Sequence, residues 1–162
     1  MSKQILLTAF KGVTNSSKIL LDNIITTKQI DKLLFTNSFD TSTRELVNQC
    51  AKINYDCIIL TGQKPNTKKL FIETVATCEN ELLETDFNYE ALKNHLLKHA
   101  FKFTVSSKAG NYLCNNIYYK ALALIKDKDL KTKCIFLHIP KKSNCDLNML
   151  AQIISEYIDC EL

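Results

Sequence analysis

The segment DCIILTG, residues 56–62, is the clearest buried strand in the sequence, and Gly62 marks its end. An uninterrupted apolar run of this length is typical of a strand covered on both faces, as in a parallel sheet packed between helices. Similar runs predict strands at ILLTAF (5–10), KLLFT (32–36) and KCIFLHIP (133–140), the last of which ends at a proline. We therefore expect a sheet of parallel strands at the centre of the protein.

The segments between these strands carry the spacing of amphipathic helices. Helices are predicted over 17–25, 41–53, 89–100, 110–125 and 146–158. The second is expected to take its cap from Thr41–Thr43, and the last from Asp146. Two more extended segments are predicted at 70–78 and 101–105. Because strands and helices alternate for most of the length, we predict an α/β fold, a three-layer α/β/α sandwich with a mainly parallel central sheet.

Length and composition indicate a single α/β domain spanning residues 1–162. The chain has 162 residues, of which 46% are hydrophobic and 23% charged, which allows a substantial core without disulfides or structural metal. Three glycines and two prolines offer no obvious linker. The net charge of +4 is spread along the chain, and the pairs Lys68-Lys69 and Lys141-Lys142 are interpreted as solvated surface. This pattern argues against a nucleic-acid partner.

The cysteines and the first residues predict a cytoplasmic protein. The chain has seven cysteines and no C-x-x-C pair, which argues against a disulfide framework and against a zinc ribbon. The thiols are therefore expected to be reduced. The apolar run in MSKQILLTAF (1–10) is too short for a signal peptide or a membrane span, so no membrane association is expected.

Cys114 is the first candidate for chemistry. In a parallel sheet, reactive groups lie at the carboxyl ends of strands and at the amino ends of the helices that follow. Cys114 falls in the first turn of the helix predicted over 110–125, where unpaired backbone N–H groups favour a thiolate and can stabilise an oxyanion. Gly110 permits a tight entry to that turn. The alternative interpretation is a small apolar residue that fills the core.

His138 is the second candidate, because it ends the run CIFLH where the strand meets the expected crevice. A hydrogen-bonded core histidine is the alternative. His95 and His99 are four residues apart on one helical face, but no H-E-x-x-H pattern supports a metal site. They are interpreted as exposed neighbours.

Glu73 is unusual because it interrupts an apolar stretch, with Leu70–Ile72 before it and Val75-Ala76 after it. A carboxylate in such a position needs a partner or must face a cleft. In contrast, the acidic residues of 79–86 are interpreted as a solvated loop. The segment TGQKPNTKK (61–69) lacks the second glycine and the lysine-hydroxyl pair of a phosphate loop.

Together these segments resemble the pyroglutamyl peptidase I family, also called pyrrolidone-carboxylate peptidases. SSKAGNYLCN (106–115) is similar to the family's nucleophile motif S-x-x-A-G-x-Y/F-x-C-N, and FLHIP (136–140) to its histidine motif. GQKPNTKKLFIETVA (62–76) keeps the family's spacing from G-Q to E-R-V-A, with Thr74 in place of the arginine. ILLTAF (5–10) looks like the family's opening I-L-V-T-G-F.

The resemblance implies a cysteine peptidase that removes an N-terminal pyroglutamyl group, or a similar small cyclic or acyl group, from peptides. Cys114 would be the nucleophile, His138 the general base and acid, and Glu73 the carboxylate that orients the imidazole. The substrate would be a small peptide with a blocked N-terminus. No metal and no organic cofactor is required. Family members often form homo-oligomers, so self-association is possible here.

The sequence departs from the family around the substrate pocket. Phe10 is retained, but Val13 replaces the second pocket aromatic and the nearby proline is absent. Gln63 is kept at a position that lines the pocket in the family, whereas Thr67 stands where the family has an arginine in the oxyanion region. The chain is also shorter than its relatives. These departures leave two alternatives, a hydrolase with a changed substrate and a non-catalytic homologue that serves as a binding or assembly subunit.

Overall fold

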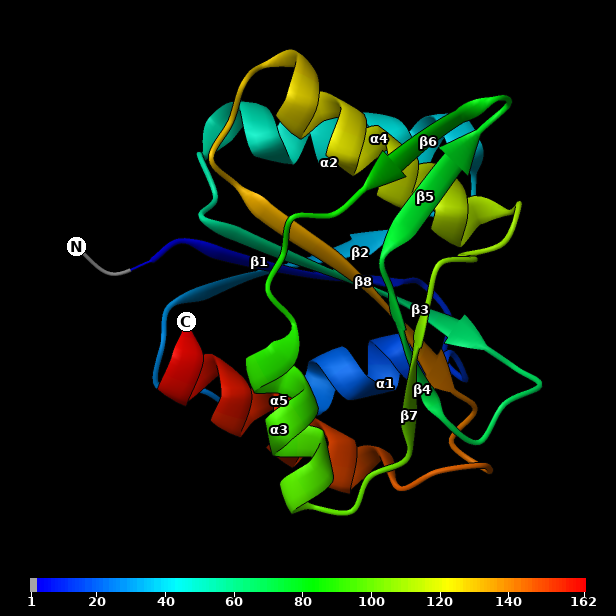
Figure 1. The fold of residues 1–162 in the computed structure, drawn as a ribbon, viewed down its shortest axis with the longest axis vertical. Helices are drawn as coiled ribbons and strands as arrows, with labels where there is room; N and C mark the ends of the chain where they lie inside the picture. The colour runs from blue at the N-terminus through cyan, green and yellow to red at the C-terminus, as the bar shows by residue number, and fades with distance from the viewer. Residues whose placement is uncertain (1–2) are drawn as a thin grey trace.

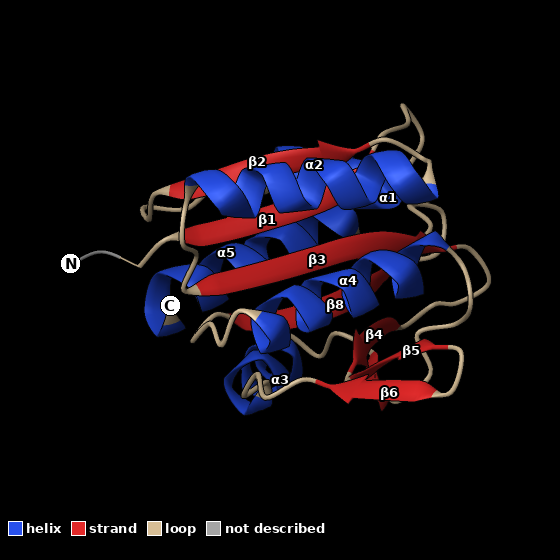
Figure 2. Ribbon diagram, turned by 90° about the horizontal axis from the view of Figure 1, so that it is seen from above, coloured by secondary structure: helices blue, strands red, loops and turns tan. Residues whose placement is uncertain are grey.

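A six-stranded sheet runs through the centre of the protein (Figures 1 and 2). The structure, a computed structural model, describes residues 3–162. The strand order is β2-β1-β3-β8-β4-β7. These strands are β1 (Ile5–Phe10), β2 (Ile30–Phe35), β3 (Cys57–Lys64), β4 (Leu70–Glu73), β7 (Phe103–Ser106) and β8 (Lys133–Pro140). The first three and β8 run parallel, whereas β4 lies antiparallel to β8 and parallel to β7. The predicted α/β sandwich with a mainly parallel sheet is confirmed.

Helices cover both faces of the sheet, as Figure 1 shows. One layer holds α2 (Phe39–Lys52) and α4 (Leu113–Asp127), and the other holds α1 (Ser16–Asn23), α3 (Glu90–Lys98) and α5 (Leu147–Glu161). Each layer packs on its own hydrophobic cluster, and the two clusters lie on opposite faces of the same strands. Within residues 3–162, no helix combines the length and the apolar character that crossing a membrane requires.

Local sequence explains where the helices begin. The Asp146 side chain accepts a hydrogen bond from the Met149 backbone N–H at 3.0 Å and caps α5 as predicted. Helix α2 starts earlier than the sequence indicates, because Ser38 is the N-cap and accepts from the Thr41 N–H. The expectation of a cap within Thr41–Thr43 is therefore wrong. Those residues already lie inside the helix.

The segment 70–78 is not one extended element. It divides into β4, which joins the central sheet, and β5 (Val75–Cys78), which leaves the sheet and pairs antiparallel with β6 (Glu81–Glu84). The acidic residues of 79–86 are exposed as predicted, but the interpretation of this segment as a loop is wrong, because Glu81–Glu84 form a strand. Leu83 is buried against the α4 side of the sheet whereas its acidic neighbours face solvent, so the composition conceals the alternation of a strand.

His95 and His99 are not simply exposed neighbours. They are only partly accessible and hydrogen-bond to two carboxylates of α5, with Nε2 of His95 at 3.3 Å from Glu161 Oε1 and Nε2 of His99 at 2.8 Å from Glu156 Oε2. These bonds join α3 to α5, so the pair has a structural explanation without a metal.

Candidate active site

The candidate residues converge on the sheet face that carries α2 and α4. Successive strand side chains point to opposite faces, and Cys134 and Phe136 of β8 belong to the hydrophobic cluster beneath α4. His138 follows them at the same two-residue spacing. Its register partners are Gly62 on β3 and Phe71 on β4, and Glu73 lies two residues beyond Phe71. His138 and Glu73 therefore share one face.

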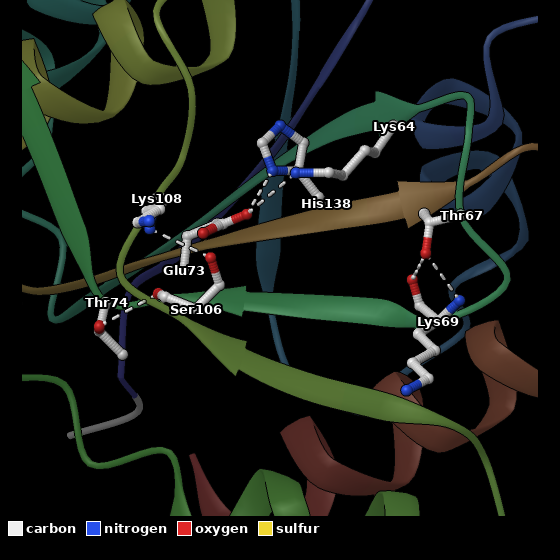
Figure 3. A network of polar contacts seen from close by, with 8 residues as sticks. All are labelled: Lys64, Thr67, Lys69, Glu73, Thr74, Ser106, Lys108 and His138. Atoms are coloured by element: carbon white, nitrogen blue, oxygen red, sulfur yellow. Dashed lines mark hydrogen bonds and ion pairs between the residues drawn. The ribbon is translucent and has the colours of Figure 1, made fainter.

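Glu73 and His138 form a direct buried contact (Figure 3). His138 Nδ1 lies 2.7 Å from Glu73 Oε1; the carboxylate is 0% exposed and the histidine 5%. Because a carboxylate only accepts, Nδ1 carries the proton and donates it. Nε2 is then the ring nitrogen that remains free to accept a proton. Of the two expectations for Glu73, a partner or a cleft, the first is confirmed.

Lys64 is a second partner of the same carboxylate. Its Nζ lies 3.9 Å from Glu73 Oε1 and 4.4 Å from the centre of the Phe71 ring. Figure 3 shows Lys64 and His138 reaching Glu73 from neighbouring strands. The other carboxylate oxygen, Oε2, is buried and has no hydrogen-bond partner among residues 3–162.

Cys114 lies in the first turn of α4, as the sequence predicts. Its sulfur sits directly over β3, because a Cβ placed on Gly62 would come within 2.5 Å of Cys114 Sγ and 2.9 Å of the Phe136 ring. Gly62 is the register neighbour of His138. Thus three distant parts of the chain meet around the end of β3. Within residues 3–162, no hydrogen bond joins Cys114 to His138.

The electrostatic environment of Cys114 differs from the sequence-based expectation. Burial, followed by the negative charge of Glu73, raises the pKa of the Cys114 thiol to about 12, while Lys64 acts in the opposite direction. The expectation that the start of α4 lowers this pKa is therefore wrong, since burial outweighs the helix amides. The thiol is neutral near pH 7 and has to lose its proton before or during any attack.

The three predicted substrate-binding residues occupy different environments. Phe10 is 4% exposed and packs against Phe35 with ring centres 5.6 Å apart, whereas Val13 is 92% exposed. Gln63 follows Gly62 directly and accepts a hydrogen bond from the Ser16 backbone N–H at 2.8 Å. The structure thus places Phe10 in the core and Val13 at the surface, and it uses the Gln63 side chain to hold the start of α1.

Two residues near the site were not identified from sequence. Only one feature of the sequence indicated that Lys64 lies near the site. It follows Gly62 by two residues, which places both residues on one strand face. Asn115 follows the candidate nucleophile and is buried; its side-chain amide accepts from the Thr77 N–H and donates to the Thr77 carbonyl, both at 2.8 Å. It therefore ties α4 to β5.

No metal centre accompanies these residues. Within residues 3–162, no group of three or more histidine, cysteine, aspartate or glutamate side chains is gathered in a way that could hold a metal ion. A thiol at the start of a helix, over the strand that neighbours a buried histidine–carboxylate pair, is typical of the cysteine hydrolases.

Comparisons with known proteins point to one family. The profile of the pyroglutamyl peptidase family matches residues 84–148, a range that contains Cys114 and His138 but not Glu73. The pyrrolidone-carboxylate peptidase of Brachyspira hyodysenteriae is 29% identical over 142 residues, covering 74% of this chain and 71% of the relative. The protein of the same name from Thermosipho melanesiensis is 28% identical over 149 residues, covering 78% and 73%.

Solved structures give the same result for the fold. The crystal structure of Bacillus amyloliquefaciens pyroglutamyl peptidase I is similar with a TM-score of 0.86 and 18% identity, over 97% of this chain and 95% of that one. The pyrrolidone carboxyl peptidase from Thermococcus litoralis gives 0.80 and 18%, over 96% and 90%. The chain is therefore similar to the pyroglutamyl peptidases in sequence over residues 84–148 and in fold over nearly all of its length.

Proposed function

We propose that this protein is a cysteine peptidase that removes an N-terminal pyroglutamyl group, or a similar small cyclic or acyl group, from peptides. The observation that carries the proposal is the buried contact of 2.7 Å between His138 and Glu73. His138 lies on β8, next to Gly62 of β3, and Cys114 Sγ lies over that glycine. A carboxylate that fixes a histidine tautomer beside a thiol is the arrangement that acyl transfer by a cysteine requires.

In the first half of the reaction, Cys114 Sγ forms a bond to the carbonyl carbon of the blocking group. Because the resting thiol is neutral, His138 Nε2 takes its proton as the sulfur attacks. The backbone N–H groups at the start of α4 stabilise the charge that develops on the carbonyl oxygen. His138 then gives the proton to the leaving amine as the amide bond breaks, which leaves a thioester on Cys114.

In the second half, His138 takes a proton from water, which attacks the thioester carbon and releases the free acid. The proton passes to Cys114 Sγ as the carbon–sulfur bond breaks. Glu73 keeps its charge throughout, holds the ring in the Nδ1–H tautomer and stabilises the imidazolium. These steps need neither a metal nor an organic cofactor.

Substrate recognition is assigned to Phe10, Val13 and Gln63. Phe10 ends β1 and Gln63 follows Gly62 on β3, so both lie at the strand ends where ligands bind in such sheets. Val13 is exposed on the segment that joins β1 to α1. A small peptide with a blocked N-terminus is the partner that this site requires.

We place the enzyme in the cytoplasm. All seven cysteines are free, and a reducing compartment preserves both these thiols and a cysteine nucleophile.

Self-association is tested by sedimentation of the intact chain at several concentrations.

The test is hydrolysis of a pyroglutamyl reporter by the wild type and four variants. Cys114→Ser and His138→Ala should each lower kcat by about 10³-fold or more, and Glu73→Gln by about 10²- to 10⁴-fold. Cys78→Ser, at an exposed cysteine, is the matched control and should retain full activity. Thermal unfolding of each variant separates lost chemistry from lost folding. Full activity in Cys114→Ser or His138→Ala would refute the assignment, and an inactive wild type would refute pyroglutamyl as the group removed.

A further inference from the structure

Lys64 occupies a place that the mechanism above does not use. It ends β3, two residues after Gly62, and its ammonium lies 3.9 Å from the carboxylate oxygen that also accepts from His138. The lysine side chain is 35% exposed, whereas the carboxylate is fully buried. One end of this ion pair is therefore shielded from solvent, unlike an ordinary surface pair, in which solvent screens both charges.

The Phe71 ring fixes the position of the ammonium. Lys64 Nζ lies 4.4 Å from the ring centre, within the range of a cation–π contact. Phe71 is the register neighbour of His138 and stands two residues before Glu73 on β4. The same short strand thus supplies the carboxylate and the surface that holds its countercharge.

A buried carboxylate needs compensation for the water that it loses. Within residues 3–162, the polar groups that pair with the Glu73 carboxylate are the His138 imidazole and the Lys64 ammonium. Its oxygen Oε2 has no hydrogen-bond partner among these residues. The histidine contributes one neutral donor as long as Nε2 is free to act as a base. Among residues 3–162, Lys64 is the one lysine or arginine whose charged group lies within ion-pair distance of the Glu73 carboxylate.

We propose that Lys64 is a positioning residue for the reaction, whose ammonium holds the Glu73 carboxylate in the orientation that accepts from His138 Nδ1. At 3.9 Å it acts through charge rather than through a hydrogen bond. It also opposes the effect of Glu73 on the thiol, since Lys64 lowers the pKa of Cys114 while Glu73 raises it. This role rests on the proposed function, but its effect on the thiol is measurable without turnover.

The test compares Lys64→Met with Lys64→Arg. Methionine keeps an unbranched apolar chain against Phe71 and removes only the charge, whereas arginine restores the charge. Lys69→Met is the control, because Lys69 follows the same strand on the exposed loop, points away from Glu73 in Figure 3 and forms no ion pair among residues 3–162. Thermal unfolding is measured for all three variants.

On the pyroglutamyl reporter, Lys64→Met should lose roughly tenfold or more in kcat with KM little changed, and Lys64→Arg should recover most of the loss. Cys114 alkylation by iodoacetamide at about pH 9, followed by mass spectrometry, should slow roughly three- to tenfold in Lys64→Met, because the thiolate fraction falls when the cation is lost. Lys69→Met should change neither measurement.

Two outcomes would overturn the proposal: kcat and alkylation within about twofold of wild type in Lys64→Met, or a Lys64→Arg variant that recovers no more than the methionine variant does. If the wild type does not cleave the reporter, the pyroglutamyl substrate fails by itself. The alkylation comparison still decides whether Lys64 acts on the site.

Discussion

At the scale of single residues, Gly62 determines whether the thiol can lie over the sheet. Because Gly62 has no Cβ, Cys114 Sγ and the Phe136 ring can occupy the space next to its Cα. The relevant property of this glycine is its lack of a side chain rather than its backbone freedom. The N-terminal end of α4 can approach β3 closely only because β3 has no Cβ at this position.

Gly62→Ala should therefore displace the thiol while the fold persists. The new methyl group would lie 2.5 Å from Cys114 Sγ, so the sulfur has to move by about 1 Å to regain van der Waals contact. A displacement of this size near reacting atoms costs about 10²-fold in rate, and overpacking costs about 1–3 kcal/mol in unfolding free energy. Reporter hydrolysis and urea unfolding measure the two effects.

A double-mutant cycle separates the sulfur from the ring. Cys114→Ala removes the sulfur, so Gly62→Ala should cost less stability in that background than in wild type, although the contact with Phe136 remains. Equal costs in both backgrounds would show that the sulfur does not occupy the space above Gly62.

The site residues differ in how well sequence could identify them. Glu73 was recognisable because a lone carboxylate in an apolar run needs a buried partner, and that partner is His138. Lys64 was not, because a lysine at a strand end is ordinarily solvated. The thiol pKa was predicted in the wrong direction, since a helix start is visible in sequence whereas the burial that raises the pKa of Cys114 is a tertiary property.

At the scale of elements, one side chain of α4 pairs with the backbone of the β5–β6 hairpin, in addition to the contacts that Tyr119 and Lys126 make with Glu81. Asn115 pairs with the Thr77 backbone as a neighbouring strand would, accepting from its N–H and donating to its carbonyl at 2.8 Å each. This clamp adjoins Cys114 in sequence. It explains why the hairpin can leave the central sheet and still be ordered beside the site.

Asn115→Ala should loosen the hairpin. The change leaves the Thr77 N–H and carbonyl without their partner, which costs about 1–3 kcal/mol in unfolding free energy. Asn116→Ala is the matched control, because Asn116 makes one long contact of 3.5 Å to Thr43 and should cost less than about 0.5 kcal/mol. Urea unfolding measures both variants. Equal stabilities would show that Asn115 does not clamp β5.

A second element-scale contact joins α5 to the loop before β2. Asp159 accepts hydrogen bonds from the Thr26 hydroxyl and from the Thr27 N–H and hydroxyl. The Thr26 hydrogen bond, followed by those of Thr27, lowers the pKa of Asp159 from its ordinary 3.8. Because the folded pKa lies below the unfolded value, the stabilisation is present above about pH 4 and is lost as the pH falls through the folded pKa.

Asp159→Asn should therefore lower Tm at pH 7, and the difference from wild type should shrink as the pH falls below about 4. Calorimetry across this range measures it. Asp127→Asn serves as the control, since Asp127 ends α4 without a hydrogen bond or ion pair of its side chain among residues 3–162. A Tm difference that stays constant with pH would exclude a role for the Asp159 charge.

Sequence predicted the buried elements of the fold better than the exposed ones. The strands at 5–10 and 133–140 have the predicted bounds, because their apolar runs end sharply. The hairpin of β5 and β6 was missed because Leu83 is its one buried residue in β6, too few to reveal a period of two. The antiparallel direction of β4 relative to β8 could not be predicted either, because it depends on which strand β4 pairs with in the folded protein.

At the scale of the whole molecule, one sheet connects the two hydrophobic clusters. Alternate residues of β1, β3 and β8 belong to opposite clusters, as Ile135 and Phe136 do. If either helix layer detached, one face of the shared strands would become exposed to solvent. The other layer packs on the opposite face of the same strands. The candidate site spans β3, β4, β8 and the start of α4, so its geometry depends on the integrity of the entire sheet.

We therefore propose that residues 1–162 form one domain and expect it to unfold in a single cooperative transition. The six tyrosines and no tryptophan make tyrosine fluorescence the tertiary probe, and far-UV circular dichroism follows the helices. The two unfolding curves should coincide. The calorimetric enthalpy of unfolding should be about 110 kcal/mol at roughly 60 °C and should equal the van't Hoff enthalpy. Two separate transitions, or a van't Hoff enthalpy well below the calorimetric one, would show that one helix layer unfolds independently, and the site would then be lost before the rest of the fold.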